Sequence, residues 1–319
     1  MSKYSERPLD FTDLKTVPIA ARGGKVTVEH FARPYLKGDG ILKWLDAMPR
    51  LLASDSFRAV LEALLQARAK RKAIIWGLGG HVIKCGLAPV LADLGRRRFA
   101  STFAVNGAAA IHDFEIAIAG QTSEDVEAVL PDGRFGSAEE TGREMNLALR
   151  QGVEDGIGMG EALGRYLKTR ADSRFSSQSL LFEAYRDSTP VTVHVAIGTD
   201  TPHTHPEADG AIIGAASHHD FRLLCALVCN LNRGGVYLNV GSAVVLPEVF
   251  LKAVSVVRNL GNPLAQFTTV NFDFLQHYRP RANVVERPHS GAGGKGYSIT
   301  GHHELMIPLL AAALVECEP

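Results

Sequence analysis

Histidines, acids and glycines with the potential for chemistry are concentrated in a few short segments of this sequence. The first is the turn Gly77-Leu78-Gly79-Gly80-His81, which directly follows a short apolar run. A glycine turn that leads from a strand into a helix presents backbone N–H groups and the positive end of the helix dipole to a phosphate. Val82 stands where a dinucleotide fingerprint has its third glycine. The turn fits phosphate binding, and it fits nearly as well a tight turn without a ligand.

A second segment, Asn106–Glu115, also follows an apolar run and begins with small residues that would let a ligand approach the backbone. The positions expected to contact a cofactor are Asn106, Gly107 and Ala108. Three polar side chains follow them, those of His112, Asp113 and Glu115. If a helix starts here, the two acids are instead stabilised by the dipole at its first turns. The sequence leaves both interpretations open.

A third segment, Thr199–Gly210, is rich in histidine and proline. Alternate histidines on an extended chain, here His203 and His205, can face one divalent metal ion, and Asp209 could complete the ligand shell. Histidines in a rigid polar loop often serve only as hydrogen-bonding groups. The spacing matches no recognised metal motif, so a metal site and a metal-free loop both remain open.

A fourth segment, His289–Tyr297, combines a glycine-rich run with Lys295. Such a loop suits contact with a phosphate or a carboxylate, and we expect Ser290, Gly291 and Ala292 to contact a cofactor. Gly296 follows the lysine where a Walker motif has Ser or Thr, so that motif is excluded. A flexible surface loop is the alternative. His302 and His303 lie shortly downstream and could do acid–base work, because imidazole titrates near neutrality.

Strands alternating with helices are predicted to position these residues. Buried apolar runs predict five strands, and helical periodicity predicts helices between and after them. The strands are expected at 73–76, 101–105, 191–197, 235–240 and 267–272. Helices are expected at 41–69, with a break at Pro49, and from the glycine turn 77–80 to residue 94. Further helices are expected from the Ser-x-x-Glu capping box at 137–140 to residue 151, and at 211–231, 247–259 and 302–315. This alternation predicts an α/β fold, a doubly wound and mostly parallel Rossmann-like sheet. Ligands bind at the carboxyl ends of such strands, where most of the candidate residues fall.

Residues 1–40 are expected to form an irregular arm, and residues 41–319 a single nucleotide-binding domain. The arm has breakers such as Pro8, Pro18 and Pro34, yet it also carries apolar residues that need a surface to cover. We therefore expect it to pack on the body or on a neighbouring subunit of a homo-oligomer.

Composition excludes several classes of protein. The 319 residues carry a formal net charge of zero, so no electrostatic footprint for nucleic acid or an anionic membrane exists. Apolar runs such as Leu305–Val315 are shorter than the roughly 20 residues of a membrane span. The mixed-charge N-terminal segment lacks the apolar core of a secretory signal, so we expect a cytoplasmic protein. Four cysteines are too few for a disulfide framework.

The order of the segments resembles that of deoxyhypusine synthase and its homospermidine synthase relatives. Gly77–Leu94, which includes Ile83-Lys84-Cys85, is similar to the family's first strand, turn and helix, and Val105–Glu115 is similar to its Thr-Ala-Gly-Gly turn followed by acids. Further matching segments, in the same order, are Thr189-Pro190-Val191 leading to Ala208-Asp209-Gly210, Gly234–Arg258, and Ser290-Gly291-Ala292. The resemblance covers roughly residues 70–315 and implies NAD binding and a dimer or tetramer.

The family's chemistry does not transfer with its fold. In the family, a lysine in a Trp-Gly-Lys sequence forms an imine with the aminobutyl group of spermidine. The corresponding region here, Ile299–Glu304, contains neither lysine nor tryptophan. The resemblance therefore implies an NAD-binding member that is not a true deoxyhypusine synthase.

Three functions remain in competition. The leading one is an NAD-dependent enzyme acting on an amine or amino-acid-like small molecule. Its polar site residues would be His112, Asp113 and Asp209, and its acid–base groups Lys295, His302 or His303. The second is a metal-dependent hydrolase built on His203, His205 and Asp209. The third is a non-catalytic nucleotide-binding relative.

Overall fold

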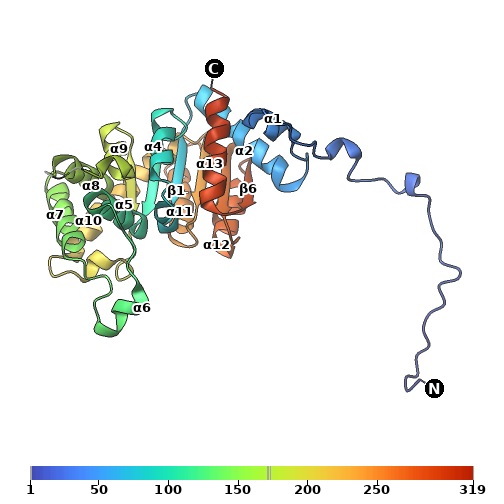
Figure 1. Ribbon diagram of the computed structural model, residues 1–319, viewed down its shortest axis with the longest axis horizontal. Helices are drawn as coiled ribbons and strands as arrows, with labels where there is room; N and C mark the ends of the chain where they lie inside the picture. Colours follow the sequence, from blue (N-terminus) through green and yellow to red (C-terminus); the bar gives the residue numbers. More distant parts are fainter. Residues whose placement is uncertain (1, 171, 173, 319) are drawn as a thin grey trace.

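A parallel sheet forms the centre of the molecule (Figure 1). The computed structural model describes residues 2–170, 172 and 174–318. Within them, six strands pair in the order β3-β2-β1-β4-β5-β6, all of them parallel. The order reverses between β1 and β4, which makes this the switch point of a doubly wound sheet. The predicted α/β, Rossmann-like class is confirmed.

The elements mostly alternate along the chain between strand and helix. The strands are β1 (Ile74–Leu78), β2 (Thr102–Asn106), β3 (Val191–His194), β4 (Val236–Val240), β5 (Phe267–Asp273) and β6 (Gly294–Thr300). The helices are α1 (Ile41–Ala47), α2 (Leu52–Ala69), α3 (Gly80–Lys84), α4 (Ala88–Arg96), α5 (Gly107–Ala119), α6 (Val126–Val129), α7 (Glu139–Glu154), α8 (Met159–Thr169), α9 (Leu180–Arg186), α10 (Gly210–Cys229), α11 (Val245–Asn259), α12 (Tyr278–Pro280) and α13 (His303–Glu316). A π-helix over Arg281–Glu286 and several short 3-10 turns complete the chain.

Alternate residues of the strands point into two hydrophobic layers, one on each face of the sheet. Ile74 and Trp76 of β1 join the layer that contains residues of α2, α4, α5 and α13. Ile75 of β1 and Tyr237 of β4 join the layer built mainly from α10 and α11. Because both faces are covered, the strands appear in the sequence as continuous apolar runs rather than as alternating ones.

Helix α10 is apolar and long enough to meet the length and composition criterion for a membrane span, a criterion that core helices also meet. A third of its apolar window (33%) is buried, along the face that packs on the sheet. The carboxylate of Asp220, in the middle of α10, accepts hydrogen bonds from the backbone N–H groups of Val193 (2.7 Å) and Gly160 (2.9 Å). This buried acid ties α10 to β3 and α8.

The five strands predicted from apolar runs are confirmed, and so is the break at Pro49, which separates α1 from α2. The predicted capping box at 137–140 does not form, since α7 begins at Glu139 after Ala138, which makes no side-chain cap. The segment His289–Tyr297, predicted to be a glycine-rich loop, is irregular only up to Gly293, and the sixth strand, β6, begins at Gly294, so the prediction is wrong for its second half. A Cβ at Gly296 would lie 2.0 Å from the Val285 carbonyl oxygen. Glycine in β6 therefore permits the π-helix to cross the strand closely.

The N-terminal arm projects away from the body (Figure 1). It meets the body at Arg33, whose N–H donates to the Ala47 carbonyl (2.8 Å), and at His30, whose carbonyl accepts from Arg50 (2.9 Å). Before these contacts the arm exposes large apolar side chains, among them Leu9 and Ile19, which are about 80% exposed (82% and 80%).

Candidate functional site

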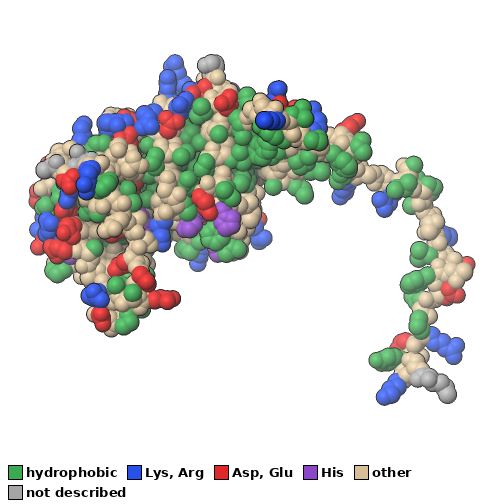
Figure 2. All heavy atoms as spheres, viewed as in Figure 1, with side chains coloured by type: hydrophobic (Ala, Val, Ile, Leu, Met, Phe, Trp, Pro, Cys, Tyr) green, Lys and Arg blue, Asp and Glu red, His purple; other side chains and the backbone are tan. Residues whose placement is uncertain are grey.

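The carboxyl ends of the strands meet at one edge of the sheet, and most of the candidate residues lie there. The β1 turn, the start of α5, the loop after β3, the β4 turn and the start of α13 all reach this edge. Figure 2 shows a hollow on the lower side of the molecule, and histidine side chains (purple) lie on the lower surface of the main body next to it.

The glycines of the β1 turn are used for close packing of the backbone. A Cβ at Gly77, inside β1, would lie 2.5 Å from the Tyr237 hydroxyl, so this glycine makes room for a tyrosine ring. A Cβ at Gly79 would lie 2.0 Å from the Gly241 carbonyl oxygen, and one at Gly80 would lie 2.9 Å from Ala108. Gly77 and Gly79 are buried, whereas Gly80 is partly exposed and His81 fully so. Only the end of the turn is open to a ligand.

A cavity of about 830 Å³ opens beside α5. That volume lies within the range of small-molecule sites, roughly 300–1,000 Å³. Its wall includes Ala108, Ile111 and His112 of α5, and the polar lining adds Lys84, Glu115, Thr122, Glu140, Thr141, Arg170 and Asp200. Glu124 also lines it, so the cavity brings together charged side chains from six separate parts of the chain.

His112 is held in one orientation by a chain of hydrogen bonds. The Thr122 hydroxyl donates to Glu115 Oε2 (2.5 Å) and lies 2.7 Å from His112 Nδ1. Since the hydroxyl has a single proton, its oxygen is left to accept from Nδ1–H. This assigns the proton to Nδ1 and leaves a lone pair on Nε2. Thr141 donates to the other carboxylate oxygen of Glu115 (3.1 Å), so the whole chain is anchored.

Burial, helped by the positive charge of Lys84, lowers the pKa of His112 to about 4. The imidazole is neutral at pH 7 and can act as a proton acceptor through Nε2.

Asp200 belongs to the loop after β3, and its carboxylate lies against the start of α5. A Cβ at Gly107 would fall 2.0 Å from its Oδ2, so Gly107 is the residue that lets this carboxylate approach the helix. Oδ2 is buried and has no hydrogen-bond partner within the part of the chain that the structure describes. Burial raises the pKa of Asp200. Asn106 caps α5, since its side chain accepts a hydrogen bond from the Ala109 N–H (2.9 Å).

Two of the predicted polar site residues hold the backbone in place. Asp113 follows His112 on α5 but is buried and accepts hydrogen bonds from the Ser179 hydroxyl (2.5 Å) and from two N–H groups at the start of α9. Burial raises its pKa to about 6, against the opposing effect of these hydrogen bonds. Asp209 is the N-cap of α10 and accepts from the Ala211 N–H (2.8 Å). Neither residue lines the cavity.

The histidines of the loop after β3 bond locally. His203 Nδ1 lies 3.4 Å from the Gly198 N–H, and His205 Nδ1 accepts from Glu207 N–H (3.1 Å). His205 Nε2 lies 3.3 Å from Glu139 Oε2. Within residues 2–170, 172 and 174–318, the side chains that could share a metal ion do not include His203 or His205. The predicted metal site on this loop is not supported.

The start of α13 lies against α3 and carries a second group of histidines. His303 is buried, with Nε2 3.3 Å from the Phe272 carbonyl and 3.8 Å from Asp273, and burial lowers its pKa. His302 is exposed and stacks on Phe274, with ring centroids 6.1 Å apart. His81 packs edge-on against Phe274 and His303. Its Nε2 lies 3.3 Å from the sulfur of Cys85.

The glycine-rich segment lies at the opposite edge of the sheet. Lys295 pairs with Thr268 at the amino end of β5, and Ser290, Gly291 and Ala292 precede β6. A strand of seven residues spans about 23 Å, so these residues cannot share a site with the β1 turn. The chain returns through α12 and the π-helix before β6 begins, so these residues lie at the amino edge of the sheet, and their contact with a cofactor stays a prediction.

No protein-family model and no curated protein matches the sequence. Solved structures do match it. A chain from Entamoeba histolytica, described as a candidate deoxyhypusine synthase, aligns with 90% of this chain and 96% of its own, with a TM-score of 0.52 and 10% identity. The chain has a deoxyhypusine synthase-like fold.

Two further structures share this deoxyhypusine synthase-like fold. A LOR/SDH protein candidate from Methanococcus maripaludis S2 has a TM-score of 0.50 and 14% identity over 83% of this chain and 70% of its own. The ternary complex of AgrE with ornithine and NAD⁺ has a TM-score of 0.50 and 16% identity over 84% of this chain and 34% of its own. The chain thus spans about a third of the length of AgrE. At these identities the likeness is one of fold.

The sequence does not predict several residues of the cavity. Thr122, Thr141 and Arg170 lie in or beside helices that carry no glycine turn or histidine cluster. Asp200 was within reach, because it follows a predicted strand and is the first acid of the loop. A rule that favours acids just beyond strand ends would have found it.

Proposed function

We propose that this protein is an NAD-binding enzyme that acts on an amine or amino-acid-like small molecule in the cavity beside His112. The observation that carries the proposal is the anchored chain Glu115–Thr122–His112, which aims a neutral imidazole into a cavity at the carboxyl edge of the sheet. In doubly wound sheets, dinucleotides bind where the strand order reverses. The cavity lies on the β2 and β3 side of that point, and its residues nearest the β1 turn are Lys84 and Ala108, the latter against Gly80.

The lining suits a cofactor and a substrate that each carry charge. Lys84 and Ala108 form the wall nearest the β1 turn, and they would hold the dinucleotide, with the lysine opposite its pyrophosphate. Lys84 makes no ion pair within the described residues, so its charge is free for a ligand. The acids Glu140 and Asp200 line the same cavity and would attract a substrate ammonium group. An amino acid carries such an ammonium group and also a negatively charged carboxylate.

When bound, NAD would supply a hydride acceptor. The residues of this chain would bind the substrate, orient it and remove a proton. His112 Nε2 would accept that proton, while Glu115 stabilises the resulting imidazolium through Thr122. The binding of ornithine and NAD⁺ by AgrE, which has the same fold, supports an amino-acid-like substrate.

Calorimetric titration with NAD and NADP, together with thermal unfolding, tests the proposal. A ligand at 100 times its Kd should stabilise the protein by about 2.7 kcal/mol. Lys84→Gln should weaken binding, whereas Lys252→Gln, which removes an exposed i,i+4 partner of Glu248, should not. No heat and no stabilisation at millimolar ligand would reject a dinucleotide site.

The proposed chemistry does not pass through a lysine imine. The nearest lysine to the family's motif position, Lys295, lies at the amino end of β6. Borohydride treatment with spermidine and NAD should therefore leave the protein mass unchanged. An adduct on any lysine would make that residue a relocated nucleophile.

We also infer a homo-oligomer, dimer or tetramer, in which the arm covers a second subunit. The support is the exposed apolar series along the arm, including Phe11, Val17 and Ile19. Contiguous exposed apolar surface of this kind marks interaction sites. Light scattering that gave only the monomer mass, 34.4 kDa, would reject the inference.

A further inference from the structure

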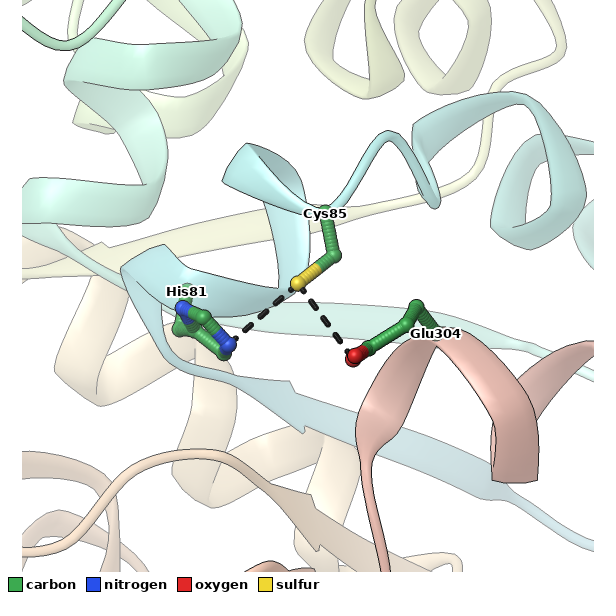
Figure 3. Close-up of side chains that lie close together, drawn as sticks. All are labelled: His81, Cys85 and Glu304. Carbon is green, nitrogen blue, oxygen red and sulfur yellow. Dashed lines mark hydrogen bonds between the residues drawn. The ribbon is translucent and has the colours of Figure 1, made fainter.

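A cluster outside the cavity gathers three different metal-ligating side chains: His81, Cys85 and Glu304 (Figure 3). Cys85 Sγ lies 3.3 Å from His81 Nε2 and 3.7 Å from Glu304 Oε2. All three ligand atoms lie within 4.8 Å of one another. In Figure 3 the three side chains converge on one point between α3 and the start of α13.

The backbone holds the first two ligands at a favourable spacing. His81 belongs to α3 and Cys85 caps it, with the Cys85 N–H donating to the His81 carbonyl (2.9 Å). Residues four apart on a helical turn present their side chains to the same side. Glu304 comes from the first turn of α13, 219 residues away in the chain from Cys85.

Neighbouring side chains orient the outer two ligands. Phe274 and His303 pack against the His81 ring, with ring centroids 5.8 Å and 5.6 Å away. Glu304 Oε1, the oxygen that faces away from the sulfur, lies 3.7 Å from His302 Nδ1. These neighbours restrict the orientations that the two ligand side chains can adopt.

We propose that His81 Nε2, Cys85 Sγ and Glu304 Oε2 bind one zinc ion and leave its fourth position open to water or a substrate oxygen. Nitrogen, thiolate sulfur and carboxylate oxygen are the ligands of zinc. Around a tetrahedral ion they would lie roughly 3.3–3.6 Å apart, from the usual bond lengths. The Nε2–Sγ and Sγ–Oε2 separations, 3.3 Å and 3.7 Å, are close to this, and the Nε2–Oε2 pair lies within 4.8 Å, so binding would draw the exposed His81 and Glu304 side chains together.

Three protein ligands with an open position are typical of catalytic rather than structural zinc. An ion here would polarise a carbonyl oxygen or acidify a bound water. Burial and the Glu304 charge raise the pKa of the Cys85 thiol, so zinc must displace the thiol proton to solvent as the Zn–S bond forms. The carboxylate and the new thiolate then balance the two positive charges.

This site goes beyond the proposed function and does not depend on it. None of the three ligands lines the cavity, and zinc binding can be measured without any dinucleotide. A failed NAD titration and a failed zinc titration would therefore be separate results.

The test is a titration of tag-free, chelator-treated full-length protein with zinc alone, followed by Co²⁺ as a spectroscopic probe. We expect one zinc per chain, one proton released, and a thiolate-to-cobalt charge-transfer band. Cys85→Ser should abolish that band and weaken zinc binding by roughly 100-fold or more, beyond the ~10–100-fold loss typical when a group that only hydrogen-bonds to a metal ligand is removed. Glu304→Gln and His81→Asn should also weaken zinc binding.

Matched controls use residues of the same types elsewhere. Cys317→Ser and His218→Gln, a cysteine at the end of α13 and an exposed histidine of α10, should retain one zinc per chain. Thermal unfolding without metal shows that each variant is folded. The proposal is overturned if the protein retains no zinc, if Cys85→Ser binds zinc as the wild type does, or if cobalt gives no thiolate band.

Discussion

Two regions of the carboxyl edge each carry histidines, and they hold them in different ways. In the cavity, His112 is fixed by hydrogen bonds to Thr122 and through it to Glu115. In the cluster beside α13, His81 is fixed by packing against Phe274 and His303, and its Nε2 faces a sulfur. Both rings are positioned, but by different neighbours.

The difference shows that the partner of an imidazole decides its chemistry. A ring that lines a cavity, with Nδ1–H anchored and a lone pair left on Nε2, is suited to accept a proton. A ring whose nitrogen converges with a thiol and a carboxylate is suited to bind a metal. The same residue type at the same sheet edge thus supports two proposals that can be tested independently.

The largest expected effect separates the two regions directly. His112→Asn should lower NAD-dependent turnover by roughly 10²–10⁴-fold, the usual contribution of a positioned general base. It should leave zinc content at one per chain, whereas Cys85→Ser should lose the zinc and keep its NAD titration. Turnover assays, calorimetry and metal analysis of both variants provide the measurements. If either substitution removed both zinc and NAD binding, the two regions would form one site.

A smaller effect concerns the backbone between the two regions. In Gly79→Ala the new Cβ would meet the Gly241 carbonyl oxygen, at 2.0 Å in the present geometry, and must push the β1 and β4 turns apart. We expect a loss of about 3 kcal/mol in the free energy of unfolding, the upper end for overpacking, because backbone cannot move as a side chain can. Urea unfolding measures it.

Gly214→Ala is the matched control for this substitution. Gly214 lies in α10 with open space where a Cβ would be, so alanine should stabilise by about 0.5–1 kcal/mol through helix propensity. Equal stabilities for the two variants would show that the turns are not tightly packed.

The smallest effects are pH dependences of opposite sign. The pKa of His112, about 4 in the folded protein, lies below its ordinary 6.5. The unfolded chain binds more protons between these values, so stability is lost as pH falls from 6.5 towards 4. Burial raises the pKa of Asp220 from 3.8 to about 7. Between these two values the folded protein binds more protons than the unfolded chain, so stability is lost as pH rises from 3.8 towards 7.

Urea unfolding across this pH range for the wild type, His112→Asn and Asp220→Asn separates the two contributions. Asp220→Asn should flatten the loss on the rising side and His112→Asn the loss on the falling side. We expect the larger change for Asp220→Asn, because Asp220 is buried whereas solvent partly screens His112. Identical curves for all three proteins would contradict both assignments.

Local sequence was enough to predict the sheet and much of its edge. The apolar runs at β1, β2, β4 and β5 are buried on both faces, so they stand out without any tertiary information. The small residues at the start of α5 predict that a ligand approaches the backbone there, whereas the group that approaches Gly107 in the structure is the Asp200 carboxylate. Residue types alone therefore predict the strands whose carboxyl ends form this edge of the sheet.

Tertiary structure decided which side chains meet. His112 and Asp113 are adjacent in sequence, yet a helix turns successive side chains about 100° apart, so one lines the cavity and the other is buried against α9. The sequence predicts that Lys295 lies in a loop, whereas in the structure it lies in β6, at the amino end of the sheet. Cys85 and Glu304 are 219 residues apart, and no local pattern could join them. Local patterns report burial and backbone preference, whereas contacts between distant segments exist only once the sheet order has brought their ends together.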